Sequence, residues 1–546
     1  MPLSENKKDR VIAWGLFAAA WLVGSSLLWF GGKTLSSPDE TAVLVTAQDI
    51  AQSYSARMPE PLAAKAGWLH PRSWVSQGEG IVPVGFIGWP WILSVFILIT
   101  GTAFTKWLSI AIAASSVPAL YVLLRKRFSR PASLVGTLTL FSYPAFFLYL
   151  NRSLFPNPPI LAATLWLTYF LKADLLSNTK SDQQKIYQNY WREFVIGILF
   201  AAICVIRPIE LFWGLPWLGA VAYTKQLHPT RKQLLAVVTG MGVILLPVWI
   251  LAWRTYGAPW SVGYFLRDNS TPTSVGAGGS AWAGSSAVRL LAFGFHPRTV
   301  WWNLRSFGFG FALPWAVLLI GVAGLYLKPW AEVCWKYRRK LKSVLRELAS
   351  PDHGFIAAIL GLGLLAAYYG NGLYTDHVRV GAVTVGNSYL RYLLPVAAIS
   401  GWAIAWLYDR VEKGRPQKIV LAIAFVLCSF GLYRGAFGDD ESVLAVIQST
   451  RLNDQTRTKT EQVMPAESII FSDRSDKIFF PTYKAVSPMP SLPEVSRLLK
   501  SIEVPAAFYS RPLNQKQRDE WRNHGLQLEE LFAFDRHVLY RIRHLP

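Results

Sequence analysis

The apolar segment VIAWGLFAAAWLVGSSLLWF (residues 11–30) is followed closely by SSPDETAVLVTAQDIAQSY (residues 36–54). About 20 apolar residues cross the hydrocarbon core of a bilayer, and the first segment is longer than the apolar core of a cleaved signal peptide. We therefore expect an uncleaved first membrane span, preceded on its N-terminal side by the basic sequence KKDR. The second segment opens on the adjacent carboxylates Asp39 and Glu40 and continues as a predicted amphipathic helix at the membrane face.

The composition of the chain indicates a multi-pass membrane protein. Its 546 residues are 52% hydrophobic and only 16% charged, whereas soluble proteins average about 25% charged residues. Lysines and arginines that collect in cytoplasmic loops explain the net charge of +22. No basic helix or aromatic-interleaved basic patch favours nucleic-acid binding instead. The cysteines Cys204, Cys334 and Cys428 are far apart, so neither a disulfide framework nor a zinc site is predicted.

The positive-inside rule decides how the apolar segments are assigned. If the run 81–103 crossed the membrane fully, the motif RKRFSR (125–130) and all later basic loops would face outward. We therefore expect 81–103 to be interfacial or broken, as its prolines and glycines also suggest. The N-terminus is then cytoplasmic, the C-terminus is extracytoplasmic, and the first large outer loop is 31–106. The eleven predicted spans are 11–30, 107–124, 131–150, 156–174, 193–206, 209–224, 234–252, 306–327, 354–370, 389–408 and 418–433.

The chain changes character at about residue 435. The tail is more polar, with strands predicted in ESIIFSD (467–473), PAAFYS (505–510) and HVLYRIR (537–543) and helices predicted in LPEVSRLLKSI (492–502) and NQKQRDEWRNHG (514–525). Alternating strands and helices predict a small α/β domain, and it has no glycine-rich phosphate loop. The predicted fold class is thus an all-α polytopic membrane protein with a small extracytoplasmic α/β domain, divided into 1–434 and 435–546.

Ionisable side chains collect on the predicted outer side, where charges near the membrane are expensive and mark functional candidates. They are Asp39, Glu40, Glu79, Arg152 in YLNRSLFPNPP (149–159), Arg207 and Glu210 in IRPIE (206–210) and Arg391 in NSYLRYLLP (387–395). A carboxylate at this place can act as general base on a hydroxyl or an amine. Arginines can hold a phosphate leaving group. With apolar grooves for a lipid, this set is typical of sugar transfer from a lipid-linked donor.

Each candidate also has a structural interpretation that the sequence leaves open. Asp39 lies in SPDE, a good helix start, and would there cap the helix. Glu79 is either a second acid of the site or a solvated loop residue. Arg152 and Arg391 would otherwise extend to lipid headgroups. Arg207, which precedes a proline, would pair with carbonyls freed at a helix break.

These motifs resemble those of the GT-C glycosyltransferases, and among them the protein O-mannosyltransferases and the lipid A aminoarabinose transferases. The resemblance rests on the DE pair after the first span, a Gly- and Pro-containing interfacial segment, and a span that ends in RKRF. It continues with a YP–R–P outer loop at 143–158, an RP-E hinge and a late RYLLP. It covers roughly residues 1–410 and is a likeness of layout and short motifs.

The resemblance implies an enzyme that transfers a hexosyl or pentosyl group from a polyprenyl phosphate, with inversion at the anomeric carbon. The reaction would take place on the outer face of the cytoplasmic membrane. By position, Asp39 would be the catalytic base with Glu40 in support. Arg391, Arg207 and Arg152 would contact the donor phosphate.

One position departs from the pattern of the family. Several relatives have an aspartate in the second outer loop, where this chain has Asn157. The second acid is therefore absent, supplied by Glu79, or not required. We predict no obligatory metal or other cofactor, and leave a divalent metal open. The expected partners are a polyprenyl-phosphate sugar, a glycan, lipid or protein acceptor, and membrane lipids, without nucleic acid.

Three other functions compete with glycosyl transfer. A transporter or flippase of lipid-linked saccharides would favour internal repeats and broken helices at the membrane midplane. The sequence has no evident repeat, and its acids lie in a loop. A polymerase or ligase of such saccharides usually has its large outer loop late in the chain, whereas here the PDE motif comes early. A non-catalytic member of the family, whose tail binds glycans or partners, is the third.

Overall fold

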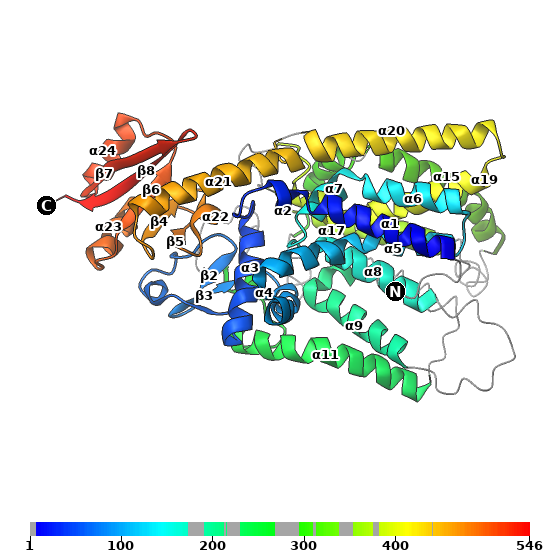
Figure 1. Cartoon of the computed structure of the whole chain (residues 1–546), viewed down its shortest axis with the longest axis horizontal. Coiled ribbons are helices and arrows are strands. Elements are labelled where there is room, and N and C mark those ends of the chain that lie inside the picture. The colour runs from blue at the N-terminus through cyan, green and yellow to red at the C-terminus, as the bar shows by residue number, and fades with distance from the viewer. Residues whose placement is uncertain are drawn as a thin grey trace. The chain divides into compact units, whose positions relative to one another are not determined.

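The structure is a computed structural model that describes residues 7–172, 190–211, 215, 230–267, 294–309, 313–337, 353–374, 382–438 and 440–545. The chain is mostly helical, with a five-stranded sheet in its C-terminal part (Figure 1). It divides into two compact units. The first comprises Met1–Ser25, Trp107–Leu246 and Ser274–Leu444, and the second comprises Ser26–Lys106, Pro247–Thr273 and Ala445–Pro546. The predicted span 209–224 lies almost entirely outside the described residues.

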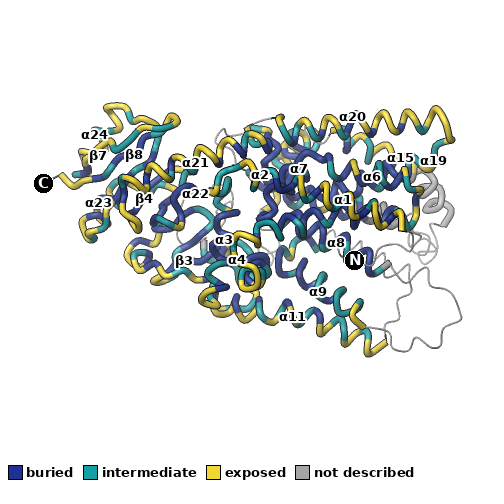
Figure 2. The backbone as a smooth tube through the Cα atoms, viewed as in Figure 1, coloured by how far each residue is buried: buried dark blue, intermediate teal, exposed yellow. Residues whose placement is uncertain are grey.

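Apolar helices build the first unit. They are α1 (Lys7–Gly24), α5 (Ser116–Arg125), α6 (Arg130–Phe141), α7 (Pro144–Asn151), α8 (Asn157–Lys172), α9 (Trp191–Ile206), α14 (Pro297–Asn303), α15 (Leu313–Tyr337), α17 (His353–Gly370), α18 (Ser388–Tyr392), α19 (Pro395–Arg410) and α20 (Arg415–Phe437). Two more helices, α4 (Gly88–Ala114) and α11 (Arg231–Tyr256), run across the boundary between the units. Figure 2 shows that α20 is exposed along most of its length although it is apolar, as expected of a helix that faces lipid.

The helices confirm a multi-pass membrane fold. Within the described residues, four stretches are long and apolar enough to cross a membrane, and two bent helix pairs raise that number to six. The four stretches are Lys7–Phe30, Gly88–Arg125, Arg231–Tyr256 and Arg415–Phe437. The total of eleven spans stays a prediction.

Two predicted segments contain breaks. The predicted span 131–150 is two helices, α6 and α7, that meet at 67°. Pro144 starts α7 without an amide donor, and Tyr143 before it is extended, with ψ of 124°. The run 81–103 is broken near its first prolines and glycines, as expected: β3 (Gly80–Pro83) ends at Pro83 and α4 begins at Gly88. Helix α4 is interrupted a second time at Gly101, where φ is 79°. That backbone conformation favours glycine.

Three of the basic motifs meet at one end of the first unit. Asp9 of α1 forms ion pairs with Arg125 (3.3 Å) and Arg130 (2.8 Å). The amide of Ser129 donates to the Asp409 carboxylate near the end of α19 (2.6 Å). The sequences KKDR, RKRFSR and DRVEKGRPQK therefore lie together.

Glycines let the helices of the first unit cross closely. A Cβ atom at Gly136 of α6 would lie 2.3 Å from the carbonyl oxygen of Gly401 of α19. The helices α9 and α11 cross in the same way, because a Cβ atom at Gly197 would lie 2.1 Å from the carbonyl oxygen of Val237. Helices in membranes associate through such close van der Waals packing between small residues.

The second unit contains the five-stranded sheet. Its strands are β4 (Ile469–Ser472), β5 (Lys484–Val486), β6 (Ala506–Ser510), β7 (Leu526–Phe534) and β8 (His537–His544), in the order β5-β4-β6-β8-β7. Strands β5, β4 and β6 are parallel to one another, and β8 is antiparallel to both of its neighbours, β6 and β7. Helices α21 (Val443–Val463), α22 (Asp476–Phe479), α23 (Leu492–Lys500) and α24 (Gln515–Asn523) accompany them. The three predicted strands and two predicted helices are confirmed, whereas β5, β7 and α21 were not predicted.

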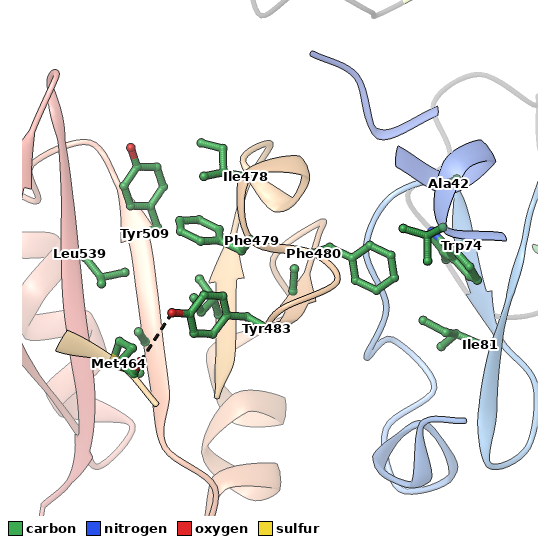
Figure 3. Close-up of a cluster of buried hydrophobic side chains, with 14 of the residues drawn as sticks. Ala42, Trp74, Ile81, Met464, Ile478, Phe479, Phe480, Tyr483, Tyr509 and Leu539 are labelled. Atoms are coloured by element: carbon green, nitrogen blue, oxygen red, sulfur yellow. Dashed lines mark hydrogen bonds between the residues drawn. The ribbon is translucent and has the colours of Figure 1, made fainter. Parts of the chain in front are cut away.

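The segment after the first span belongs to the same compact unit as this sheet. It forms α3 (Pro38–Ser53) and a three-stranded sheet of β1 (Met58–Pro59), β2 (Trp74–Ser76) and β3 (Gly80–Pro83), with the 3-10 helix η1 (Pro61–Ala64). Ala42, Trp74 and Ile81 from this segment share one hydrophobic core with Met464 and Phe480 (Figure 3). The Trp74 and Phe480 ring centres are 5.4 Å apart.

Candidate active site

The acidic pair opens α3, but Asp39 does not cap it. Ser37 is the N-cap residue, with extended backbone, and its hydroxyl accepts the amide of Asp39 at 3.3 Å. Pro38 takes the first helical position, which suits a residue without an amide donor. The exposed Asp39 carboxylate instead accepts a hydrogen bond from the hydroxyl of Ser73 at 2.6 Å. Its place in the first turn is also favourable for a negative charge.

The two neighbouring acids have different surroundings. Glu40 is 2% exposed, and its carboxylate accepts a hydrogen bond from the Ser36 hydroxyl at 2.8 Å. Asp39 is open to solvent and is oriented by Ser73. Of the two acids, Asp39 is the one that presents its carboxylate to solvent, whereas Glu40 is buried at the start of the helix.

Glu79 lies on an exposed turn. It follows Gly78, which has φ of 58°, between β2 and β3. Its backbone carbonyl accepts the amide of Glu60 at 3.0 Å. Within the described part of the chain, no ion pair or side-chain hydrogen bond joins Glu79 to Asp39. This placement fits the solvated loop residue better than the second acid.

The three candidate arginines gather in the first unit around aromatic rings. Arg391 of α18 and Arg152, which caps α7, both face the ring of Phe155, with guanidinium carbons 4.2 Å and 4.9 Å from its centre. The guanidinium carbon of Arg207 lies 3.9 Å from the ring centre of Tyr392. Arg391 also donates to the Tyr392 hydroxyl at 3.3 Å. The helix ends that hold these arginines are separate in sequence, yet the structure brings them together.

Arg207 has polar partners on the neighbouring turns. It ends α9 in an extended conformation, and the 3-10 turn η3 (Pro208–Glu210) follows directly. Its Nε lies 3.7 Å from the Glu210 carboxylate, which is 3% exposed. Its Nη1 donates to the Asn157 side-chain oxygen at 3.4 Å. The predicted helix break at this arginine is thus confirmed, and its side chain lies beside the one position that departs from the family pattern.

Polar residues of this cluster and aliphatic residues line the same small hollow. The residues that line it are Asn157, Ile160, Leu161, Glu210, Arg391, Tyr392, Leu394 and Pro395. Of its polar members, Arg391 and Asn157 can donate hydrogen bonds to phosphate oxygens, whereas the Glu210 carboxylate would oppose a phosphate and instead balances the charge of Arg207. The aliphatic members are suited to the hydrocarbon that adjoins it.

The sequence identified the arginines and Glu210 as candidates, but not Phe155 and Tyr392 as parts of the cluster. Phe155 follows Arg152 by three residues and Tyr392 follows Arg391 directly, so aromatic neighbours of the arginines were the available signal. Glu210 was visible in the motif IRPIE. Among the residues that the structure describes, no three His, Cys, Asp or Glu side chains gather as a metal site requires.

The acidic pair belongs to the second unit and the arginine cluster to the first. No protein-family model matches the sequence, and no curated protein matches it either. The fold is nevertheless similar to that of solved structures, which agrees with the resemblance noted in the sequence.

Those structures are of ArnT from Cupriavidus metallidurans. The apo state has a TM-score of 0.55 at 10% identity, over 97% of both chains. The structure bound to undecaprenyl phosphate has a TM-score of 0.52 at 11% identity, also over 97% of both chains. Identities this low establish the fold alone. The likeness extends over the C-terminal sheet as well, beyond the roughly 410 residues that the motifs cover.

Proposed function

We propose that this protein is a glycosyltransferase that moves a sugar from a polyprenyl-phosphate donor to an acceptor. The observation that supports this most directly is the convergence of Arg152, Arg207 and Arg391 on Phe155 and Tyr392. The fold is shared with a solved ArnT that holds undecaprenyl phosphate.

The arginine cluster would bind the donor phosphate. Guanidinium groups remain charged at all accessible pH values and hold phosphate oxygens in paired hydrogen bonds. The aliphatic wall of the hollow, with Ile160 and Leu161, would contact the first isoprene units of the donor. The aromatic rings orient the guanidinium groups through cation–π contacts.

In the proposed reaction, an acceptor oxygen or nitrogen attacks the anomeric carbon from the face opposite the phosphate. The new bond forms as the bond between the anomeric carbon and the phosphate oxygen breaks, so the configuration inverts. The electron pair leaves with polyprenyl phosphate, whose added charge the arginines stabilise. The acceptor proton passes to Asp39, the proposed base. Glu40 supports the helix start, and no second acid is used, which agrees with Asn157 and with the exposed position of Glu79.

The proposed location is the outer face of the cell membrane, with the N-terminus cytoplasmic and the C-terminal sheet extracytoplasmic. The meeting of KKDR, RKRFSR and DRVEKGRPQK at one end of the first unit supports this, because short basic loops stay on the cytoplasmic side. This topology also agrees with an interfacial or broken segment 81–103 that does not form a membrane span of its own.

The test uses the purified full chain in lipid nanodiscs. Hexose- and pentose-charged undecaprenyl phosphates are offered with glycan, lipid and peptide acceptors, and released undecaprenyl phosphate and labelled acceptor are measured. We expect release by wild type, and a loss of about a hundredfold or more in Asp39→Asn. Asp519→Asn, a carboxylate on α24, is the matched control and should retain full activity.

Three results would contradict the proposal. Full activity in Asp39→Asn would remove Asp39 as the base. Movement of intact donor across liposome membranes, without cleavage of the bond between sugar and phosphate, would favour a transporter. Growth of a donor-linked saccharide chain would instead favour a polymerase or ligase.

A further inference from the structure

The segment between the first span and Asp39 is held by the C-terminal part of the chain within the second unit. Its backbone forms hydrogen bonds with side chains of α21. The Phe30 carbonyl accepts a hydrogen bond from Arg451 Nε (2.6 Å), and the Gly32 amide donates one to Thr450 Oγ1 (3.0 Å). The amides of Thr34 and Lys33 donate to the two carboxylate oxygens of Asp454, with 2.7 Å between the Thr34 nitrogen and Oδ1. A Cβ atom at Gly32 would lie 2.2 Å from the Thr450 carbonyl oxygen, so only glycine permits this approach.

A lysine of α22 extends this series to the start of α3. Lys477 Nζ donates to the Ser36 carbonyl at 2.6 Å. Ser36 directly precedes the cap residue Ser37, and its hydroxyl donates to the Glu40 carboxylate. The lysine therefore fixes the backbone immediately before the turn that presents Asp39.

Asp476, which directly precedes Lys477, contacts the residue before the hydrogen-bond donor of Asp39. Asp476 is 1% exposed, and it accepts both the amide and the Nε of Arg72, each at 2.8 Å. Arg72 directly precedes Ser73, the residue whose hydroxyl donates to Asp39. Ser73 has φ of 65°, an uncommon conformation for a residue other than glycine that persists only when its surroundings enforce it. The ion pair between Arg72 and the buried carboxylate of Asp476 anchors the residue directly before it.

Helix α3 and strand β2 also pack into the same hydrophobic core. Ala42, one turn after Asp39, and Trp74, one residue after Ser73, belong to the cluster that contains Phe480 (Figure 3). Since α3 and β2 pack on the segment that follows α22, a displacement of α22 would move Asp39 and its hydrogen-bond donor together.

We propose that Asp476 and Lys477 are positioning residues for Asp39, and that the C-terminal domain thereby sets the geometry of the acid. Lys477 fixes the backbone before the acid, and Asp476 holds Ser73 in the conformation that orients its carboxylate. This inference rests on the proposed role of Asp39 as the base.

The test compares Lys477→Met, Asp476→Asn, the conservative Lys477→Arg and the control Lys516→Met, an exposed lysine on α24. In the full chain in nanodiscs, we expect kcat to fall about tenfold to a hundredfold in the first two, as for displacements that affect catalysis from a distance. The donor KM should stay within about twofold, because the phosphate site is unchanged. Lys477→Arg should recover most of the activity.

Hydrogen exchange provides a second readout that does not depend on turnover. Exchange at residues 30–40 should rise in Lys477→Met, while the strands β4, β6 and β8 keep their protection. If kcat stays at the wild-type value while exchange at 30–40 rises, the inference is wrong. It is also wrong if the strands lose protection to the same degree, because the lysine would then only stabilise the domain.

A double-mutant cycle tests whether Asp476 affects Asp39 through Ser73. If Asp476 acts through Ser73, the double variant of Asp476→Asn with Ser73→Ala should be no slower than Ser73→Ala alone. Additive losses would overturn that path. If wild type transfers no sugar to any acceptor, the proposed function fails by itself. Unchanged exchange at residues 30–40 in both Asp476→Asn and Lys477→Met would overturn the inference independently.

Discussion

The guanidinium group of Arg391 lies over the face of Phe155, 4.2 Å from the ring centre. Arg152 faces the same ring, so one aromatic side chain orients two of the three cations in the cluster. This arrangement holds the guanidinium groups in fixed positions where a flexible aliphatic neighbour would not.

Phe155→Leu removes this aromatic face while it retains an apolar side chain. We expect the donor KM to rise about tenfold, in line with a desolvated cation–π interaction, because both arginines lose their orientation. Steady-state kinetics with varied donor concentration measure this effect. The half-buried Phe141→Leu, on α6, is the control and should leave KM unchanged. An unchanged KM in Phe155→Leu would mean that the ring only fills space.

Asn157→Asp introduces an acid at the position where this chain departs from the family pattern that its motifs resemble. The new carboxylate would lie at the Asn157 contact with Arg207, now 3.4 Å, and would compete with the donor phosphate. We expect the donor KM to rise about tenfold, as for one added unfavourable charge contact. The rise should diminish at acidic pH, where the carboxylate is neutral. A higher kcat in Asn157→Asp would instead mean that a second acid assists this reaction.

Glu210→Gln removes the carboxylate paired with Arg207. Because removing one partner of a buried ion pair leaves an uncompensated charge, we expect a lower thermal midpoint for the ligand-free variant. Undecaprenyl phosphate should raise the midpoint more in Glu210→Gln than in wild type, since the added phosphate replaces the missing charge. Thermal unfolding with and without undecaprenyl phosphate measures both effects. Equal ligand-induced shifts would separate Glu210 from the phosphate site.

Asp49→Asn tests whether burial of the Asp49 carboxylate on α3 makes its charged form unfavourable for folding. Burial raises the pKa of Asp49 from its ordinary value of 3.8 to about 6. Between these values the folded state binds more protons than the unfolded state, so this group lowers stability as the pH rises through that window. Above pH 6 the full penalty is present in wild type and absent in the variant. We expect Asp49→Asn to unfold at a higher temperature than wild type at pH 8 and at nearly the same temperature at pH 4.

A lower midpoint for Asp49→Asn at pH 8 would show that the charged form of Asp49 is stabilised. The exposed acid Glu79, replaced by Gln, is the control for pH effects that do not involve burial. Its unfolding temperature should differ little from wild type at either pH.

Local signals account for the parts of the fold that the sequence predicts. The start of α3 follows from SPDE, although the cap is Ser37 and not Asp39. The break at Arg207 follows from the proline after it, and β4, β6 and β8 follow from short β-branched and aromatic runs. The bend before Pro144 had the same kind of signal, but the continuous apolar composition of 131–150 concealed it.

Contacts over long sequence separations account for most of what was missed. Arg72 and Asp476 are 404 residues apart, and Ser36 and Lys477 are 441 residues apart. Neither pair has a local pattern, because both residues of each pair would also be ordinary surface residues of a polar segment. The arginine cluster was predictable as a set of cations, but its aromatic members were recognisable only once helix ends met in space.

The pairing of residues 30–81 with residues 450–480 also determines which parts of the second unit can form early during synthesis. Arg72 is synthesised 404 residues before Asp476, which corresponds to roughly 20 to 80 seconds at common elongation rates of about 5–20 residues per second. Throughout that interval the segment with Asp39 lacks the strands that complete its hydrophobic core. This core therefore closes only after the last part of the chain has been synthesised.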